Sequence, residues 1–246
     1  MAGHSRWAQV KHKKAGADAK RGAVFSKLAR LITVAAREAG PDPNTNSKLR
    51  NAIEQARSAG IPKENVERAI SRAAGGDEAE KLREVEYEAY GPGGTAMLIT
   101  GLTDNPNRTT NEVKRILAEL GGRLAEAGSV AWLFERRIAA DFETPAADAE
   151  REALELALID AGAEDTLALE GRLRAIVPPN RTEAFRERIE ASGRSPIGWS
   201  AVAFPKNPIK VLPGDRARIR SLVAALEDHP DIHEVWTNVA DLATAP

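Results

Sequence analysis

The spacing of hydrophobic residues changes along this chain of 246 residues and divides it into a helical part and a mixed part. Steps of three and four predict an amphipathic helix over about 18–39, and similar steps predict helices over 47–59 and 62–74. Ser47 is the expected N-cap of the second helix. Short connections between the three helices are typical of a small bundle. Residues 1–16 show no such spacing and are predicted to form a polar arm, with partial helix formation on binding as an alternative.

From residue 84 the hydrophobic spacing becomes two, which is typical of strands. One face of this first strand is predicted to be buried, and the other face is predicted to be acidic and solvated. The acidic face consists of Glu84, Glu86 and Glu88. A glycine-rich turn at 91–94 and a strand over 95–102 complete a hairpin. A loop over 103–109 then leads into a helix, and residues 129–135 are predicted to form a further strand.

Residues 137–204 show a self-contained pattern of four strands and two helices in the order βαββαβ, which is the ferredoxin-like arrangement. Its elements are predicted over 138–143, 145–161, 165–170, 172–177, 180–191 and 195–204. A helix over 215–228 and a strand over 231–239 follow, and we expect them to complete the sheet that begins at residue 84.

The predicted fold class is therefore α+β, with an N-terminal helical bundle plus two α/β domains, the ferredoxin-like one inserted into the other. The basic helical domain spans 1–80 and ends in a charged linker over 77–83. A split α/β domain combines 84–136 with 206–240. The inserted ferredoxin-like domain spans 137–205.

Charge is distributed unevenly along the chain, although the total of 35 basic and 36 acidic residues gives a net charge of only −1. Eight of the first thirty residues are Lys or Arg and only Asp18 is acidic, so this basic segment carries +7. Residues 1–76 carry +9, and the remainder carries −10. Such cation density favours contact with a phosphate backbone, while the anionic remainder favours one orientation on it. A merely solvated charged face is the alternative.

Residues suited to catalysis or metal binding are sparse. The chain has no cysteine, and Pro230 interrupts any helical face that would align His229 with His233 as ligands. Without a nucleophile motif or an acid/base pair, no catalytic residue, metal, cofactor or small-molecule substrate is predicted, and the protein is not predicted to be an enzyme. No apolar run is long enough for a membrane span, so we expect a cytoplasmic protein without a membrane partner.

The loop 103–109 contains several side chains that form hydrogen bonds readily, at a junction between a strand and a helix. They are Asp104, Asn105, Asn107 and Arg108. The favoured interpretation is helix capping and turn formation by the Asp and Asn side chains. The alternative is that Arg108, together with Asn107, makes a secondary contact with a phosphate or with a partner protein.

Several stretches of the sequence resemble the YebC/PmpR family, which includes a mitochondrial translational activator of cytochrome c oxidase. The similar stretches are MAGHSRWAQVKHKK, DAKRGAVFSKLAR, YEAYGPGGTAMLITGLTDNPNRT, GGRLAEAGSVAWLF and ALIDAGAED. Pro106 departs from the residue usual in the family. The resemblance implies three domains and a non-enzymatic role in gene expression. That role is either DNA-binding transcriptional regulation or RNA binding on the ribosome to assist translation.

In both versions the basic N-terminal segment is the expected contact with the nucleic acid, whether DNA or ribosomal RNA. Contacts of Lys and Arg with phosphates position a protein without reading sequence. His4 and Trp7 are candidates to stack on an unpaired base, and Trp7 is equally suited to the bundle core. The predicted nucleic-acid-binding residues are His4, Arg6, Trp7, Lys11, His12, Lys13, Lys14, Lys20, Arg21, Lys27 and Arg30.

The predicted helices at 47–59 and 62–74 offer few side chains for base edges beyond Asn51, Gln55 and Arg57. Sequence-specific reading of DNA by a helix-turn-helix is therefore less favoured than binding by shape and phosphate contact, which suits structured RNA. A further hypothesis from another class is a protein–protein adaptor that acts through the acidic ferredoxin-like domain.

Overall fold

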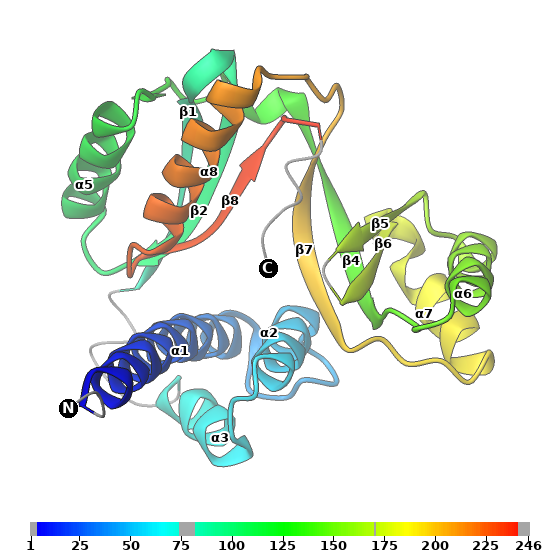
Figure 1. Cartoon of the computed structure of the whole chain (residues 1–246). Helices are drawn as coiled ribbons and strands as arrows, with labels where there is room; N and C mark the ends of the chain where they lie inside the picture. The colour runs from blue at the N-terminus through cyan, green and yellow to red at the C-terminus, as the bar shows by residue number, and fades with distance from the viewer. Residues whose placement is uncertain (1–3, 74–81, 170, 241–246) are drawn as a thin grey trace. The chain divides into compact units, whose positions relative to one another are not determined.

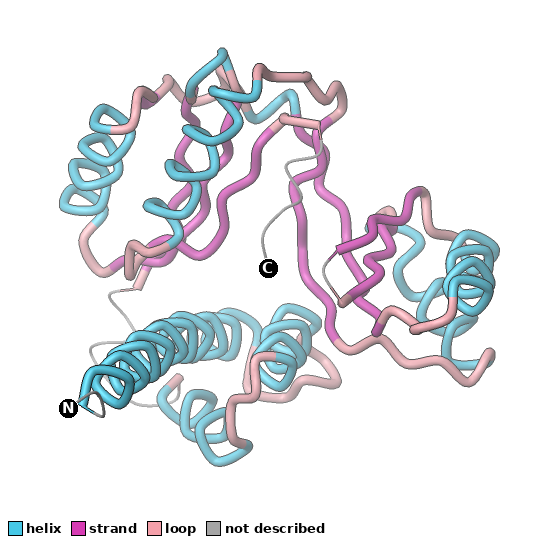
Figure 2. Tube along the Cα trace, viewed as in Figure 1, coloured by secondary structure: helices cyan, strands magenta, loops and turns pink. Residues whose placement is uncertain are grey.

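The computed structural model describes residues 4–73, 82–169 and 171–240. Side chains are described from Arg21 onward. The chain forms two compact units, residues 1–79 and 80–246. The described part of the first unit is helical, and the second unit combines strands with helices (Figure 2). Most of the linker predicted over 77–83 lies outside the described residues.

The N-terminal unit contains helices α1 (His4–Ala39), α2 (Ser47–Ser58) and α3 (Lys63–Arg72) (Figure 1). The prediction of a polar arm over 1–16 is wrong from His4 onward, because α1 begins there and continues for 36 residues. This stretch is rich in Lys and Ala, whose intrinsic helix propensity is high, so it forms a helix without the spacing of a buried face. The buried core of the unit includes Ile32, Ala36, Leu49, Ile53, Ala56, Ile61 and Val66.

Asn46 joins the end of α1 to the start of α2. Its Oδ1 accepts a hydrogen bond from the Leu49 amide at 3.0 Å, so Asn46 and not Ser47 is the N-cap of α2. Its Nδ2 donates to the carbonyls of Ala35 at 2.7 Å and Gly40 at 2.8 Å. One buried side chain therefore satisfies backbone groups at two helix ends and fixes the angle between the helices.

The first sheet of the second unit is antiparallel, with strands in the order β3-β1-β2-β8. These are β1 (Arg83–Tyr90), β2 (Ala96–Thr103), β3 (Arg123–Leu124) and β8 (Ile232–Thr237). Helices α5 (Pro106–Glu119) and α8 (Pro213–Glu227) cover one face, where apolar residues of both helices and of β1, β2 and β8 form a buried core. The sheet is therefore complete only when β8, from the last part of the chain, pairs with β2.

Strands β2 and β8 approach each other most closely at Gly101. A Cβ atom there would lie 2.2 Å from the carbonyl oxygen of Asp231, so no larger residue fits. The register between the strands shifts at this point, between Thr100 and Gly101. The close approach places the start of β8 beside the end of β2.

The second sheet has the order β5-β6-β4-β7 and is also antiparallel. Its strands are β4 (Phe134–Glu143), β5 (Asp165–Leu169), β6 (Arg172–Val177) and β7 (Gly198–Pro205). Helices α6 (Asp148–Ala161) and α7 (Thr182–Ala191) pack on one face around Phe142, Leu158, Phe185 and Ile189. The chain order β4-α6-β5-β6-α7-β7 with this strand order is the ferredoxin-like arrangement, as predicted.

The ferredoxin-like segment leaves and rejoins the first sheet at adjacent points. Phe134, at the start of β4, pairs with Pro205, at the end of β7 (Figure 1). The α+β fold class with a helical N-terminal part and two sheets is confirmed. The exact boundaries of three separate domains, over 1–80, 84–136 plus 206–240, and 137–205, stay a prediction.

Two predicted elements differ in the structure. Residues 129–135 do not form one strand: a 3-10 turn at Ala131–Leu133 precedes β4. The loop predicted over 103–109 is shorter, because α5 begins at Pro106 and includes Asn107 and Arg108. Proline suits this first helical position, since the backbone amide that it lacks would have no partner within the helix.

Candidate nucleic-acid interface

Helix α1 carries every residue of the predicted basic nucleic-acid contact. At 1.5 Å of rise per residue, its 36 residues extend about 54 Å. The side chains of its first part lie outside the described residues, and this applies to His4, Arg6, Trp7, Lys11, His12, Lys13, Lys14 and Lys20. Their backbone is helical, so these residues are arranged along one rod and not along an extended arm.

The described cations of the basic segment differ in exposure. Arg21 is exposed, whereas Lys27 and Arg30 are half-buried and each takes part in an interaction within the protein. Phe25, between them, packs against the core of the bundle, as predicted from its apolar spacing. The hydrophobic core of the bundle therefore begins near Phe25. Arg21, Lys27 and Arg30 lie at the edge of that core.

Helix α2 presents few groups that could read bases. Asn51 and Gln55 are half-buried on α2, and Arg57 is exposed near its end. Ala52, Ile53 and Ala56 of the same helix are buried in the core, which occupies one of its faces. Helix α3 exposes Asn65, Arg68 and Arg72 together with Glu64 and Glu67, so its polar face carries charges of both signs.

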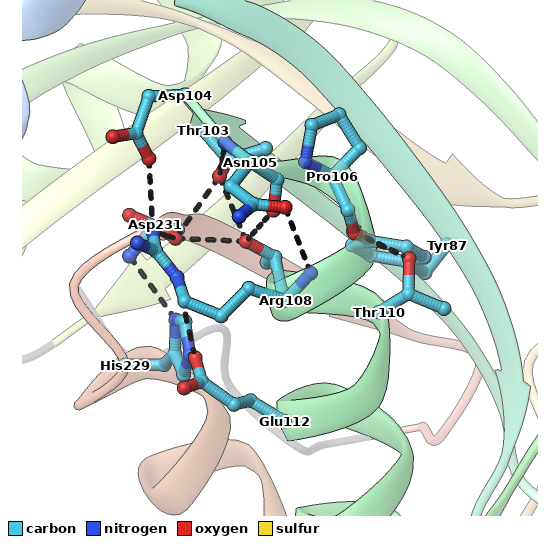
Figure 3. A network of polar contacts seen from close by, with 11 residues as sticks. Tyr87, Thr103, Asp104, Asn105, Pro106, Arg108, Thr110, Glu112, His229 and Asp231 are labelled. Carbon is cyan, nitrogen blue, oxygen red and sulfur yellow. Dashed lines mark hydrogen bonds and ion pairs between the residues drawn. The ribbon is translucent and has the colours of Figure 1, made fainter.

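The second candidate site lies at the start of α5, where the chain forms a dense polar network (Figure 3). Asn105 is the N-cap of the helix, and its Oδ1 accepts a hydrogen bond from the Arg108 amide at 3.1 Å. The Asn105 amide in turn donates to Thr103 Oγ1 at 2.9 Å. The favoured interpretation of this loop, capping by an Asn side chain, is confirmed.

Asp231 is the centre of this network, although it belongs to the far end of the chain. Its carboxylate is 3% exposed, and its Oδ2 lies 2.8 Å from Thr109 Oγ1, 3.1 Å from Thr103 Oγ1 and 2.7 Å from a terminal nitrogen of Arg108. Burial raises the pKa of Asp231, but the hydrogen bonds from Arg108 and the two threonines outweigh it, so the pKa is lowered overall. The carboxylate is therefore held ionised.

His229 extends the network to the next turn of α5. The Asp231 amide donates to His229 Nδ1 at 3.1 Å, so this nitrogen acts as an acceptor. Nε2 then carries the proton and donates to Glu112 Oε2 at 2.7 Å. Figure 3 shows His229 and Glu112 beside the Arg108 side chain. The geometry ties α5 to the turn before β8.

Arg108 and Asn107, the predicted secondary contact, differ in their engagement. Arg108 is 45% exposed and pairs with Asp231 and with Asp104, at 3.0 Å. Its pKa is raised, first by the hydrogen bond to Asp231. Any phosphate at Arg108 would compete with these carboxylates. Asn107 is exposed.

Within the described residues, no group of three or more His, Asp or Glu side chains could hold a metal ion. In the same part of the chain, no helix has the length and apolar character needed to cross a membrane.

Comparison with known protein families decides the family. The model of the "TACO1/YebC protein N-terminal domain" matches residues 5–76, and that of the "TACO1/YebC second and third domain" matches residues 82–239. The chain belongs to the TACO1/YebC family. The first match covers the basic helical unit, and the second covers both sheets.

Two TACO1/YebC relatives illustrate how far the similarity extends. A "probable transcriptional regulatory protein" of Caldanaerobacter subterraneus subsp. tengcongensis is 44% identical over 97% of this chain and 98% of its own length. One of Fervidobacterium nodosum is 45% identical over 97% of this chain and 93% of its own length. The crystal structure of a "conserved hypothetical protein" from Aquifex aeolicus is 39% identical and covers 96% of this chain and 97% of its own, with a TM-score of 0.83.

Two positions in this TACO1/YebC chain have roles that the sequence pattern did not indicate. The pattern predicts that Glu88 lies on the solvated face of its strand, but it is buried and accepts hydrogen bonds from the backbone amides of Gly128, Val130 and Ala131. Asp231 was placed within a strand, yet it precedes β8 and bonds to α5. Both contacts join residues far apart in sequence, so neither leaves a local signal.

Proposed function

We propose that this protein is a non-enzymatic, nucleic-acid-binding regulator of gene expression that grips its target through the basic N-terminal segment. One observation carries the proposal: eight cationic residues and a single acidic one occupy the first thirty positions, all of them on one helix. Phosphate neutralisation by such a cluster releases counterions and supplies binding free energy without base recognition. The regulatory names of the relatives support this role.

Structured RNA is the favoured target. The half-buried Asn51 and Gln55 of α2 leave little for reading base edges in a major groove, and the exposed Glu64 and Glu67 of α3 would be repelled by DNA phosphates. Contacts made mainly to phosphates and shape suit RNA helices and loops. Asn107 and Arg108 remain a proposed secondary contact, with Arg108 exchanging a carboxylate partner for a phosphate.

The proposal is tested by replacing Lys11, Lys13 and Lys14 together with Ala in the full chain. Binding to every RNA or DNA sequence should weaken by a similar factor, and the slope of log affinity against log salt should flatten by about two to three units. A matched control removes three cations elsewhere, through Lys114→Ala, Arg115→Ala and Arg151→Ala, and should leave the slope unchanged. Equal behaviour of the two triple variants would overturn the proposed interface.

Sedimentation of a lysate through sucrose separates the two targets. Co-migration with ribosomes that is lost when residues 1–21 are deleted supports RNA binding in translation. Absence from ribosomes, combined with footprints at defined promoters, supports DNA binding in transcription. Either result leaves the basic segment as the contact surface but decides which polymer it holds.

The adaptor hypothesis has one specific observation in its favour, which is the outer face of α6. Leu156 and Ile159 are 63% and 51% exposed there, and Glu152 and Asp160 are exposed beside them in the sequence. An apolar pair with acidic neighbours suits a protein partner with basic flanks. If nucleic-acid affinity is insensitive to the N-terminal lysines, this face becomes the leading candidate.

A further inference from the structure

Trp132 is exposed in a protein whose other described tryptophans are buried. Its side chain is 62% exposed, whereas Trp199 and Trp236 are both in hydrophobic cores. It lies in the 3-10 turn Ala131–Leu133, between the two sheets in the sequence. An exposed indole offers a large, flat apolar ring to a binding partner.

The backbone around Trp132 is held by a buried carboxylate from β1. Glu88 accepts hydrogen bonds from the amides of Gly128 at 2.5 Å, of Val130, and of Ala131 at 2.8 Å. Burial raises the pKa of Glu88, but these three amides outweigh it and lower the pKa overall, so the carboxylate stays ionised. Gly128 has φ of +84°, which few other residues adopt, so the turn depends on glycine. These contacts hold the turn that carries Trp132 in one conformation.

The orientation of the indole is also fixed. The Ser129 carbonyl accepts hydrogen bonds from Trp132 Nε1 at 3.0 Å and from the Tyr90 hydroxyl at 3.3 Å. The guanidinium of Arg123 lies 4.7 Å from the centre of the Tyr90 ring. Trp132 and Tyr90 are thus joined through one carbonyl, and Arg123 covers the Tyr90 ring. Together the three side chains form a preorganised surface. Because the polar edge of the indole is satisfied by Ser129, the part that remains available is apolar.

Two cations lie near this turn, Arg123 beside Tyr90 and Lys206, which also pairs with Glu135 at 3.9 Å. The Lys206 amide donates to the Leu133 carbonyl at 2.9 Å, which places the segment after β7 beside the turn. Residues 206–220 contain five Lys or Arg and one acidic residue. Lys206 and Lys210 are exposed, and so is Arg123 on the other side. Exposed cations on both sides of the indole favour a polyanion over an apolar pocket of a protein partner.

We propose that Trp132 is a second nucleic-acid contact, at which the indole stacks on an unpaired base while the neighbouring cations hold the flanking phosphates. The inference rests on the proposed function and deepens it, because it names single-stranded RNA as the ligand of this site. Aromatic stacking combined with cations is the usual way in which proteins bind single strands without sequence preference. A fixed aromatic ring loses little conformational entropy when a base stacks on it.

The test compares Trp132→Ala and Trp132→Phe in the full chain, with a short oligouridine and an RNA duplex as probes. Trp132→Ala should weaken oligouridine binding about tenfold, as expected for loss of one stacked base, and should leave duplex binding unchanged. Trp132→Phe should retain most of the affinity. Leu212→Ala is the matched control, since Leu212 is 73% exposed and lies outside the aromatic pair. Unchanged oligouridine affinity in Trp132→Ala overturns the inference.

A spectroscopic readout shows whether the base meets this ring. In protein labelled with 5-fluorotryptophan, the resonance lost in Trp132→Phe should shift on addition of oligouridine, while that of buried Trp199 should not. If Trp132→Ala binds RNA normally but no longer sediments with ribosomes, the indole docks on protein and the inference fails. If only the triple lysine variant loses RNA binding, the proposed function is supported and the Trp132 site is refuted. An effect of Trp132 alone would instead overturn the basic N-terminal interface.

Discussion

The cations of the two units differ in what surrounds them. In the second unit, the described arginines are commonly held by carboxylates: Arg174 bonds Asp141 at 2.7 and 2.9 Å, and Arg137 bonds Glu164 at 2.7 Å. The basic N-terminal segment has only Asp18 to set against eight cations. The same residue types therefore have different roles in the two regions. Cations paired with carboxylates contribute to the fold, whereas an excess without local acids is suited to an external polyanion.

The sharpest way to test this contrast is Arg174→Met, which removes a paired cation and keeps its apolar stem. Asp141 is buried and would keep only Arg172, at 3.5 Å. The free energy of unfolding should fall by about 3 kcal/mol, because a buried carboxylate loses its bidentate partner. Urea unfolding at neutral pH measures this.

The control for that experiment is the triple replacement of Lys11, Lys13 and Lys14 by Ala, which should change the free energy of unfolding by less than about 0.5 kcal/mol. The double variant Asp141→Ala with Arg174→Met should lose less than the sum of the single losses. A large loss from the lysines, or none from Arg174, would contradict the division into structural and ligand-facing cations.

Asp231→Asn should have the next largest effect, about 2 kcal/mol at neutral pH, since Arg108 and two threonine hydroxyls lose an ionised acceptor. The pKa of Asp231 is lowered in the folded protein. Its contribution is therefore complete above the usual carboxylate range and is lost as the pH falls through the folded pKa. The difference between wild type and variant in urea unfolding should shrink in acid. A difference independent of pH would mean that the charge is irrelevant.

Glu234→Gln should have the smallest effect and the opposite sign. Burial raises the pKa of Glu234 to about 7, and nearby Glu227 adds to this while Arg174 opposes it. The folded state thus disfavours the ionised form, and stability falls as the pH rises from the usual carboxylate pKa towards 7. The variant should be more stable by about 1 kcal/mol at pH 8 and equal to wild type in acid. Thermal melts at both pH values would show this, and a less stable variant at pH 8 would refute it.

The elements that bury one face could be predicted from the sequence. Leu49, Ile53 and Ala56 placed α2, and the βαββαβ order placed the ferredoxin-like segment. The start of α1 was missed because hydrophobic spacing detects only helices that pack, whereas Ala- and Lys-rich segments are helical by propensity alone. Strand β3 has two residues, which is too short for any alternation to appear.

The parts of the sites that the sequence did not predict depend on distant partners. Val130, Trp132 and Phe134 alternate like a strand, but Glu88 binds the amides that a neighbouring strand would have used. The alternating pattern of its strand predicts that the Glu88 side chain faces solvent. Only the folded structure brings the turn close enough to bind it. For Arg108, sequence reasoning identified the helix cap but could not supply Asp231, which lies 123 positions away.

The position of β8 in the first sheet has a consequence for synthesis on the ribosome. Ile232 and Val235 complete the core that β1, β2 and α5 begin, so that core cannot close until the last strand has left the exit tunnel. The ferredoxin-like segment contains all four strands of its own sheet and can form earlier. During synthesis, the ferredoxin-like sheet is therefore complete before the first sheet has its last strand. A chain that ended before Thr237 would lack part of β8 and could not complete the first sheet.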